Sequence, residues 1–162
     1  MGIWLPVTLV AKSRRTIEYV RVQTRISGTV TFFPQLNYTC RKKEYAAWAG
    51  DVLSVCVFDG ERCVCLQEFP ADGYKNLCNL TVPSPRLWYP NGYGDPFVYR
   101  YEILLKDKQG NEWDRYCGTF GIREVRILQE PVGKDRLNFQ IEVNGQRIFV
   151  KGSNWVPAGF MT

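Results

Sequence analysis

Hydrophobic and polar residues alternate along most of this chain with a period of two, which is typical of strands with one buried face. No segment keeps an apolar period of 3.6 residues with capping signals, and residues 45–49 allow one helical turn at most. Strand-like runs occur at about residues 17–26, 29–39, 51–58, 62–69, 76–82, 97–106 and 112–120. Turn chemistry separates several of these runs, as at Asp59-Gly60. The pattern predicts an all-β protein, with an immunoglobulin-like (fibronectin III-like) antiparallel β-sandwich over residues 15–122.

The two ends of the chain do not fit this sandwich. Residues 3–10 are strand-like but contain Pro6, which favours an edge or a bulge, and they have no obvious partner. At the other end, residues 137–143 and 146–150 flank Asn144-Gly145, the strongest two-residue hairpin signal. A buried strand is expected to end near Gly152, before a polar and aromatic exit. We expect this strand to be the first of a parallel barrel, and the chain to be a piece of a longer protein.

Composition and charge exclude several classes of partner. The chain has 162 residues, of which 45% are hydrophobic and 23% charged, as in a soluble globular protein. No window approaches the roughly 18 apolar residues of a membrane helix, and no basic segment precedes an apolar run at the N-terminus. The net charge is +5, and the basic runs at 12–15 and 41–43 lack interleaved aromatic residues. We expect neither a nucleic-acid nor a membrane partner.

Candidate chemistry within the chain is sparse. There is no histidine, which excludes a histidine-based triad and most zinc sites, and no cofactor or metal site is expected. Of the six cysteines, Cys63 and Cys65 form a C-x-C, without the C-x-x-C spacing of a zinc ribbon. Alternation predicts both thiols on one strand face, packed as small hydrophobic groups. Buried free thiols are favoured over a disulfide framework, because a domain of this size does not need cross-links.

Residues 85–94 contain two aromatic residues around a proline and then a glycine-rich turn. Within them, 87–94 resembles the L-W-x-P-N-G-Y-G motif of family 2 glycoside hydrolases, particularly the β-mannosidase branch. Residues 2–7 resemble the G-I-W-x-P-V segment that ends the family's N-terminal sugar-binding jelly roll, and 120–123 match its F-G-I-R. The stretches 139–144 and 149–157 resemble the F-x-x-x-x-N-G and F-x-K-G-x-N-W-x-P sequences at the start of the catalytic barrel.

The resemblance implies three regions. Residues 1–14 would end the jelly-roll domain, 15–122 would form the sandwich, and 123–162 would form a hairpin and the first strand of a truncated (β/α)8 barrel. The partners implied are the jelly-roll and barrel domains of the same polypeptide, and a carbohydrate substrate bound by the parent enzyme. The parent's compartment stays unassigned, because periplasmic, secreted and lysosomal locations are all compatible with the relatives.

The resemblance also implies a retaining exo-glycosidase that hydrolyses terminal β-linked sugars, with two glutamates about 5–5.5 Å apart. The resemblance favours a β-mannosidase as the parent enzyme, with a β-galactosidase or an exo-β-glucosaminidase as alternatives. Both catalytic glutamates lie on later barrel strands in the family. Glu124, Glu130 and Glu142 match neither catalytic motif, so we expect no catalytic residue in this chain and no activity from it alone. A free-standing immunoglobulin-like carbohydrate-binding or adhesion module is the alternative.

Asn154 and Trp155 are the candidate substrate-binding residues. They follow the expected strand 148–151, and barrel enzymes place functional groups at the C-terminal ends of barrel strands. Substrate contact and a structural role both remain open for them, with Asn154 suited to bond a sugar hydroxyl. For the aromatic residues of 85–94, packing at a domain junction is favoured over sugar stacking. Residues 120–123 are expected to form a hinge, with Gly121 permitting a turn and Arg123 bonding a carbonyl or carboxylate.

Overall fold

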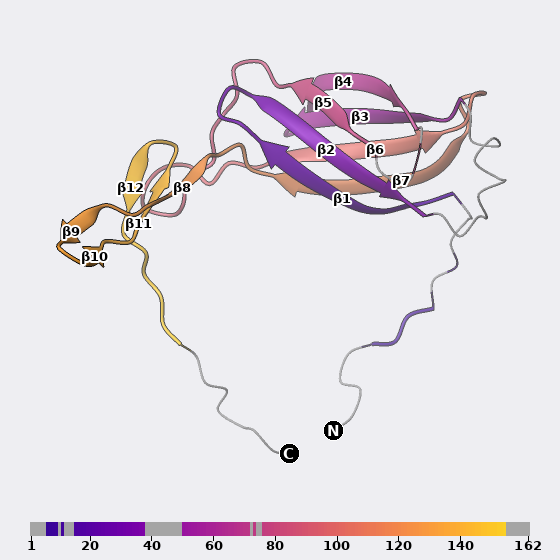
Figure 1. The fold of residues 1–162 in the computed structure, drawn as a ribbon. Helices are drawn as coiled ribbons and strands as arrows, with labels where there is room; N and C mark the ends of the chain where they lie inside the picture. The colour runs from indigo at the N-terminus through magenta and orange to yellow at the C-terminus, as the bar shows by residue number, and fades with distance from the viewer. Residues whose placement is uncertain are drawn as a thin grey trace.

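A computed structural model of the chain describes residues 6–9, 11, 15–37, 50–71, 73 and 76–154. Within these residues all regular structure is β, in twelve strands (Figure 1). The described part of the chain has no helix long and apolar enough to cross a membrane. The all-β prediction is therefore confirmed.

Seven of these strands form a sandwich of two antiparallel sheets, drawn as the larger body in Figure 1. One sheet has the order β1-β2-β5 and the other β4-β3-β6-β7, which is the fibronectin III-like arrangement predicted from the sequence. Its strands are β1 (Ile17–Thr24), β2 (Thr29–Leu36), β3 (Val52–Asp59), β4 (Arg62–Pro70), β5 (Cys78–Thr81), β6 (Tyr99–Lys106) and β7 (Glu112–Phe120).

The core of the sandwich follows from the alternation of its strands. In β2 and β6 every second residue is buried, so one face of each strand turns inward. Phe32 lies at the centre, with its ring centroid 4.9 Å from that of Tyr101 and 5.6 Å from that of Phe120. Burying such a side chain contributes about 1.5–3 kcal/mol, so this aromatic cluster is a main source of the stability of the sandwich.

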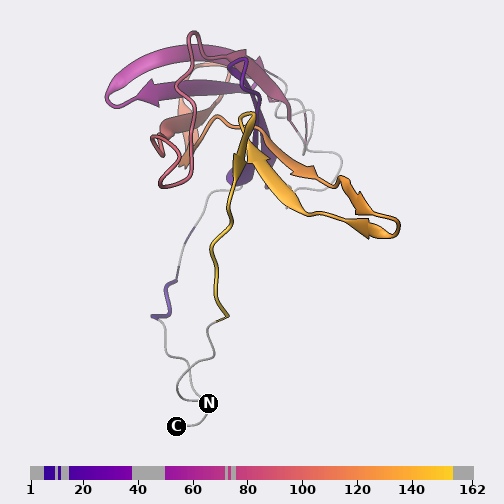
Figure 2. The same cartoon turned by 90° about the vertical axis from the view of Figure 1, so that its left-hand side faces the viewer.

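Five further strands beyond β7 form two small sheets that project from one end of the sandwich (Figures 1 and 2), and together they are called the C-terminal sheet below. Three of them pair in the order β12-β11-β8, and β9 pairs with β10. The predicted Asn144-Gly145 hairpin is present, with both residues at positive φ (52° and 82°). The pairing of β8 with β11 and the β9–β10 hairpin were not predicted. These strands are β8 (Val125–Leu128), β9 (Pro131–Gly133), β10 (Arg136–Leu137), β11 (Gln140–Val143) and β12 (Gln146–Ile148).

The segment after β12 differs from the buried strand expected there. Strand β12 ends at Ile148, and residues 149–154 have no strand structure. Phe149 is 74% exposed and Val150 59%, because no strand of the described chain pairs with this segment. At the opposite terminus, the described residues 6–9 are likewise exposed and unpaired. Residues 45–49, for which the pattern allows one helical turn at most, lie outside the described residues.

The prediction that Cys63 and Cys65 share a strand face is wrong. A β-bulge shifts the register between Val57 and Phe58, so that Cys65 lies opposite Val57 and Cys63 opposite Phe58. Because Val57 and Phe58 point to opposite faces, their partners do too. Cys65 packs against the core, whereas Cys63 is exposed.

Free thiols were predicted correctly for the part of the chain that the structure describes. All five described cysteines are free, although only Cys78 among them is buried, and Cys40 lies outside the described residues. Burial raises the pKa of the Cys78 thiol to about 12, and it does the same for Cys56, where neighbouring Cys63 adds to the effect. Both groups remain neutral thiols at physiological pH and are poor nucleophiles.

Candidate functional site

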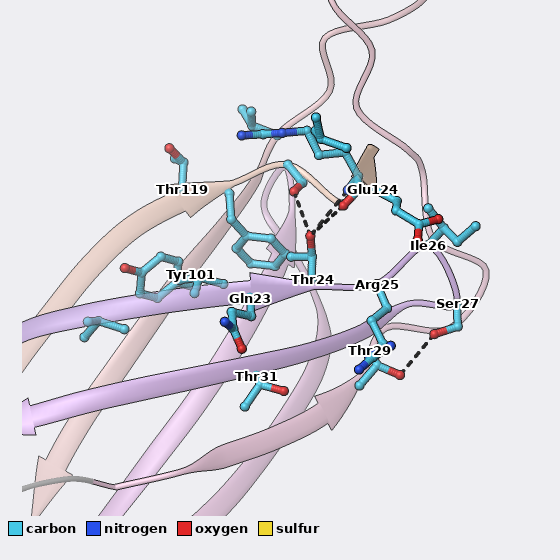
Figure 3. A pocket seen from close by; sticks show the side chains of 17 residues that line it. Gln23, Thr24, Arg25, Ile26, Ser27, Thr29, Thr31, Tyr101, Thr119 and Glu124 are labelled. Atoms are coloured by element: carbon cyan, nitrogen blue, oxygen red, sulfur yellow. Dashed lines mark hydrogen bonds between the residues drawn. The ribbon is translucent and has the colours of Figure 1, made fainter. Parts of the chain in front are cut away.

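A groove lies at the end of the sandwich next to the C-terminal sheet (Figure 3). It runs between the β1–β2 hairpin and the link from β7 to β8, and it encloses about 1120 Å³ while remaining open to solvent. The edge strands of the two sheets meet here, so the groove is the open side of the sandwich. Threonine and serine hydroxyls line its rim, with Tyr101 and Phe120 deeper in.

The polar groups of the groove already bond to one another. The Thr24 hydroxyl lies 3.4 Å from the Gly121 carbonyl and 3.3 Å from the Arg123 carbonyl, and donates to this pair of oxygens. The Ser27 and Thr29 hydroxyls are 3.1 Å apart. Figure 3 shows the Thr24 contacts running from the hairpin to the β7–β8 link, and the Ser27–Thr29 contact within the hairpin. The Thr24 hydroxyl therefore ties the hairpin to the β7–β8 link.

The groove lacks the groups for glycoside hydrolysis. Glu124 is the one carboxylate among its lining residues, and its Oε1 is 3.1 Å from Nη2 of Arg126. A retaining glycosidase needs two carboxyl groups about 5–5.5 Å apart. Burial raises the pKa of the Tyr101 phenol to about 12, so this phenol stays protonated and neutral at physiological pH. Across the described residues, no cluster of three or more His, Cys, Asp or Glu side chains could hold a metal ion.

A second acidic group with a shifted pKa lies away from the groove. Asp51 directly precedes β3, near Lys106 at the C-terminal end of β6. Burial raises the pKa of this carboxyl, while Arg15 opposes the shift through an ion pair of 2.8 Å. The neighbouring Asp107 adds to this rise in the pKa of Asp51, and neither acid lines the groove.

The two candidate substrate-binding residues are not part of this groove. Asn154 is exposed on the segment after β12 and does not line the groove. Trp155 lies outside the described residues. A substrate role for either residue stays a prediction from the sequence.

The aromatic motif 85–94 lies at the junction between the sandwich and the C-terminal sheet. Leu87 forms a parallel bridge with Ile122, and the Trp88 amide donates to the Ile122 carbonyl at 2.9 Å. A Cβ on Gly121 would lie 2.7 Å from Cβ of Trp88, so glycine is required for this close approach. The guanidinium of Arg123 lies 4.6 Å from the centroid of the Trp88 ring.

These contacts refine the interpretation of both motifs. Packing at a junction, favoured for Trp88 over sugar stacking, agrees with its half-buried position. Gly121 has a packing role as well, because Trp88 occupies the space of its side chain. Arg123 stacks on an aromatic ring where a bond to a carbonyl or carboxylate was expected. Sequence reasoning identified both motifs but missed that they contact each other.

Comparisons with known proteins agree with the resemblance found in the sequence. Residues 58–123 match the profile of the family described as "Glycosyl hydrolases family 2". The chain is 36% identical over 87 residues to a protein named Beta-mannosidase B from Emericella nidulans, covering 54% of this chain and 10% of that protein. A second Beta-mannosidase B, from Aspergillus clavatus, is 42% identical over 81 residues, 49% of this chain and 9% of that protein.

A solved structure of a β-D-mannosidase from Dictyoglomus thermophilum superimposes on 97% of this chain with a TM-score of 0.75 and 25% identity. The matched part is 19% of that longer chain. The resemblance to family 2 glycoside hydrolases and their β-mannosidase branch is thus confirmed. The chain spans about a tenth of the length of the curated relatives it matches.

Proposed function

We propose that this chain, which belongs with the family 2 glycoside hydrolases, is a non-catalytic region of a retaining exo-glycosidase that releases terminal β-linked mannose. Its task is to support the catalytic barrel of the same polypeptide. The carrying observation is an apolar face on the C-terminal sheet, of which Val125 and Ile127 are more than half exposed.

This apolar face is set by strand register. Val125 lies opposite Val143, and Ile127 lies opposite Ile141, which in turn lies opposite Ile148. Residues directly opposite in an antiparallel pair share a face, so these five side chains form one surface. Val125 is 54% exposed and Ile127 61%, whereas Ile141 and Ile148 are half-buried and Val143 is buried. The exposed part of this surface is therefore the part on β8.

The other face of the same sheet is charged. Glu142 lies opposite Arg126 on one side and opposite Arg147 on the other. The sheet is therefore amphipathic, with a solvated face and an apolar face. A contiguous exposed apolar surface marks a site of contact with another protein surface.

Two facts support the barrel as the occupant. The curated relatives are about ten times longer than the matched segment, so most of such a polypeptide lies outside this chain. The apolar face is also continuous in sequence with residues 149–157, which resemble the family's first barrel strand. A barrel needs about 250 residues in total, and its outer surface would bury the apolar face.

The substrate is proposed from the relatives. Curated proteins and a solved structure named as β-mannosidases match this chain. β-Galactosides and β-glucosaminides are the alternatives, because specificity is set by barrel loops. The longer polypeptide should hydrolyse aryl β-mannoside faster than the other two glycosides, and the 162-residue chain alone should show no turnover. Turnover by the chain above a vector control would refute the non-catalytic role.

A carbohydrate-binding module is the second candidate function, favoured by the open groove of about 1120 Å³. Titration of the chain with β-mannobiose, followed by amide shifts, separates the two. Shifts confined to Thr24, Ser27 and Thr119 would support a binding module. An unchanged spectrum at millimolar sugar would favour the scaffold.

A further inference from the structure

Two asparagines in the C-terminal sheet make the same pair of bonds with a glutamate backbone. The Asn144 amide donates to the Glu124 carbonyl at 2.9 Å, and the Glu124 amide donates to Oδ1 of Asn144 at 2.9 Å. Asn138 and Glu130 repeat this arrangement at 2.9 Å and 2.7 Å. In both places the side-chain oxygen closes the end of a strand pair.

The remaining side-chain donor distinguishes the two asparagines. Nδ2 of Asn138 stays within the sheet, 3.3 Å from Oε2 of Glu130. Nδ2 of Asn144 leaves the sheet and donates to the Trp88 carbonyl at 2.9 Å, in a partly buried position. Asn144 therefore links the C-terminal sheet to residues 85–94, called the junction loop below, whereas this side-chain bond of Asn138 stays within the sheet.

Trp88 is a firm point of attachment. Its amide bonds the Ile122 carbonyl at 2.9 Å, and its side chain fills the space above Gly121. Asn144 is also the residue best able to meet both demands of its position. Its φ of 52° suits a tight hairpin turn, which asparagine tolerates better than most residues, and its amide supplies the donor to Trp88.

The same loop holds the far end of β12. The Tyr93 hydroxyl accepts a hydrogen bond from the Phe149 amide at 2.8 Å. Tyr93 is itself held in a turn, since its amide donates to the Pro90 carbonyl at 3.0 Å. Strand β12 runs from Gln146 to Ile148, so Asn144 and Phe149 flank it on both sides. The junction loop thus contacts the chain just before and just after this strand.

We propose that Asn144 and Tyr93 are positioning residues that latch the C-terminal sheet to the sandwich. Together they fix the direction in which residues 149–154 leave the domain. The chain itself joins the sandwich to the C-terminal sheet through residues 121–124. These two hydrogen bonds add contacts between residues 85–94 and the β11–β12 hairpin. The consequence for an attached barrel rests on the proposed function, whereas the latch itself is a property of this chain.

The test uses the 162-residue chain and matched variants. Asn144→Asp keeps the acceptor for Glu124 and replaces the donor to Trp88 with a carboxylate oxygen, which repels that carbonyl. Asn144→Gly keeps the positive φ and removes both side-chain bonds. Asn138→Asp makes the same chemical change at a site with no contact to the junction loop. Tyr93→Phe removes the acceptor for Phe149, and Tyr19→Phe changes an exposed tyrosine on β1 as its control.

Residual dipolar couplings of the two sheets and amide exchange at Phe149 are the measurements. With Asn144→Asp and Asn144→Gly, the couplings of the C-terminal sheet should average separately from those of the sandwich, and Asn138→Asp should keep one common alignment. Tyr93→Phe should speed exchange at Phe149 about tenfold without changing the melting temperature of the sandwich. A common alignment in both Asn144 variants, or unchanged Phe149 exchange in Tyr93→Phe, would overturn the latch. Neither outcome bears on glycosidase activity, so failure of the latch and failure of the proposed function are separate results.

Discussion

The sandwich and the C-terminal sheet are built from the same alternation of apolar and polar residues, yet they use it differently. In the sandwich the apolar faces meet, and Val30, Phe32 and Ile103 have no exposed surface. In the C-terminal sheet only part of the corresponding face is covered: Val143 is buried, but Ile127 is 61% exposed. Alternation therefore predicts that a strand has an apolar face, and the presence of a second layer decides whether that face becomes core.

The largest expected effect contrasts the two apolar faces directly. Phe32→Ala removes the centre of the aromatic cluster and should lower the free energy of unfolding by about 3–5 kcal/mol. Ile127→Ala should change it by less than about 0.5 kcal/mol in the isolated chain, because the side chain is largely exposed. Urea denaturation followed by tryptophan fluorescence measures both. Equal losses would show that the C-terminal sheet has a core of its own.

The next effect separates a glycine at the junction from one in the C-terminal sheet. Gly121→Ala places a methyl group 2.7 Å from Cβ of Trp88 and should cost about 1–3 kcal/mol. Gly133→Ala is the control, because a Cβ there meets no atom within 4 Å. Thermal unfolding of both variants gives the comparison. A Gly121→Ala variant as stable as the control would mean that the loop is not seated against the β7–β8 link.

Alkaline pH should weaken the sandwich through its buried acids. The pKa of Cys78 is raised from 9.0 to about 12 and that of Tyr101 from 10.0 to about 12, both by burial. Between pH 9 and 12 the unfolded chain therefore loses protons that the folded chain retains, so stability falls as pH rises. Each group adds a slope of up to about 1.4 kcal/mol per pH unit.

Tyr101→Phe should flatten this slope between pH 10 and 12, and urea midpoints measured across that range would show it. A Tyr101→Phe slope identical to that of the unchanged chain would contradict the assignment.

The smallest effect belongs to the charged face of the C-terminal sheet. Arg147 and Glu130 form an ion pair of 2.8 Å, with about half of each side chain exposed. Arg147→Ala should shift stability by less than about 1 kcal/mol, and added salt should reduce that shift further. Melting temperatures at low and high salt test this. A loss of several kcal/mol would make this face a structural element in its own right.

Sequence alone predicted the sandwich well because its strands are long and their alternation is regular. The strands β8 and β9 escaped prediction, since both are short and every residue of β9 is exposed. The opposite faces of Cys63 and Cys65 depend on a bulge, which leaves no clear mark in the sequence. The contact between Trp88 and Gly121 joins two motifs far apart in the chain, so the pattern within either motif could not predict it.

The central claim is that the apolar face of the C-terminal sheet docks a catalytic barrel. Ile127 and Arg126 are neighbours on β8 that point to opposite faces, and they provide a matched pair of substitutions. In the longer polypeptide, Ile127→Ser should lower the melting temperature of the intact enzyme by several degrees, whereas Arg126→Ser should leave it nearly unchanged. Equal melting temperatures for the two variants in the longer polypeptide would contradict the account.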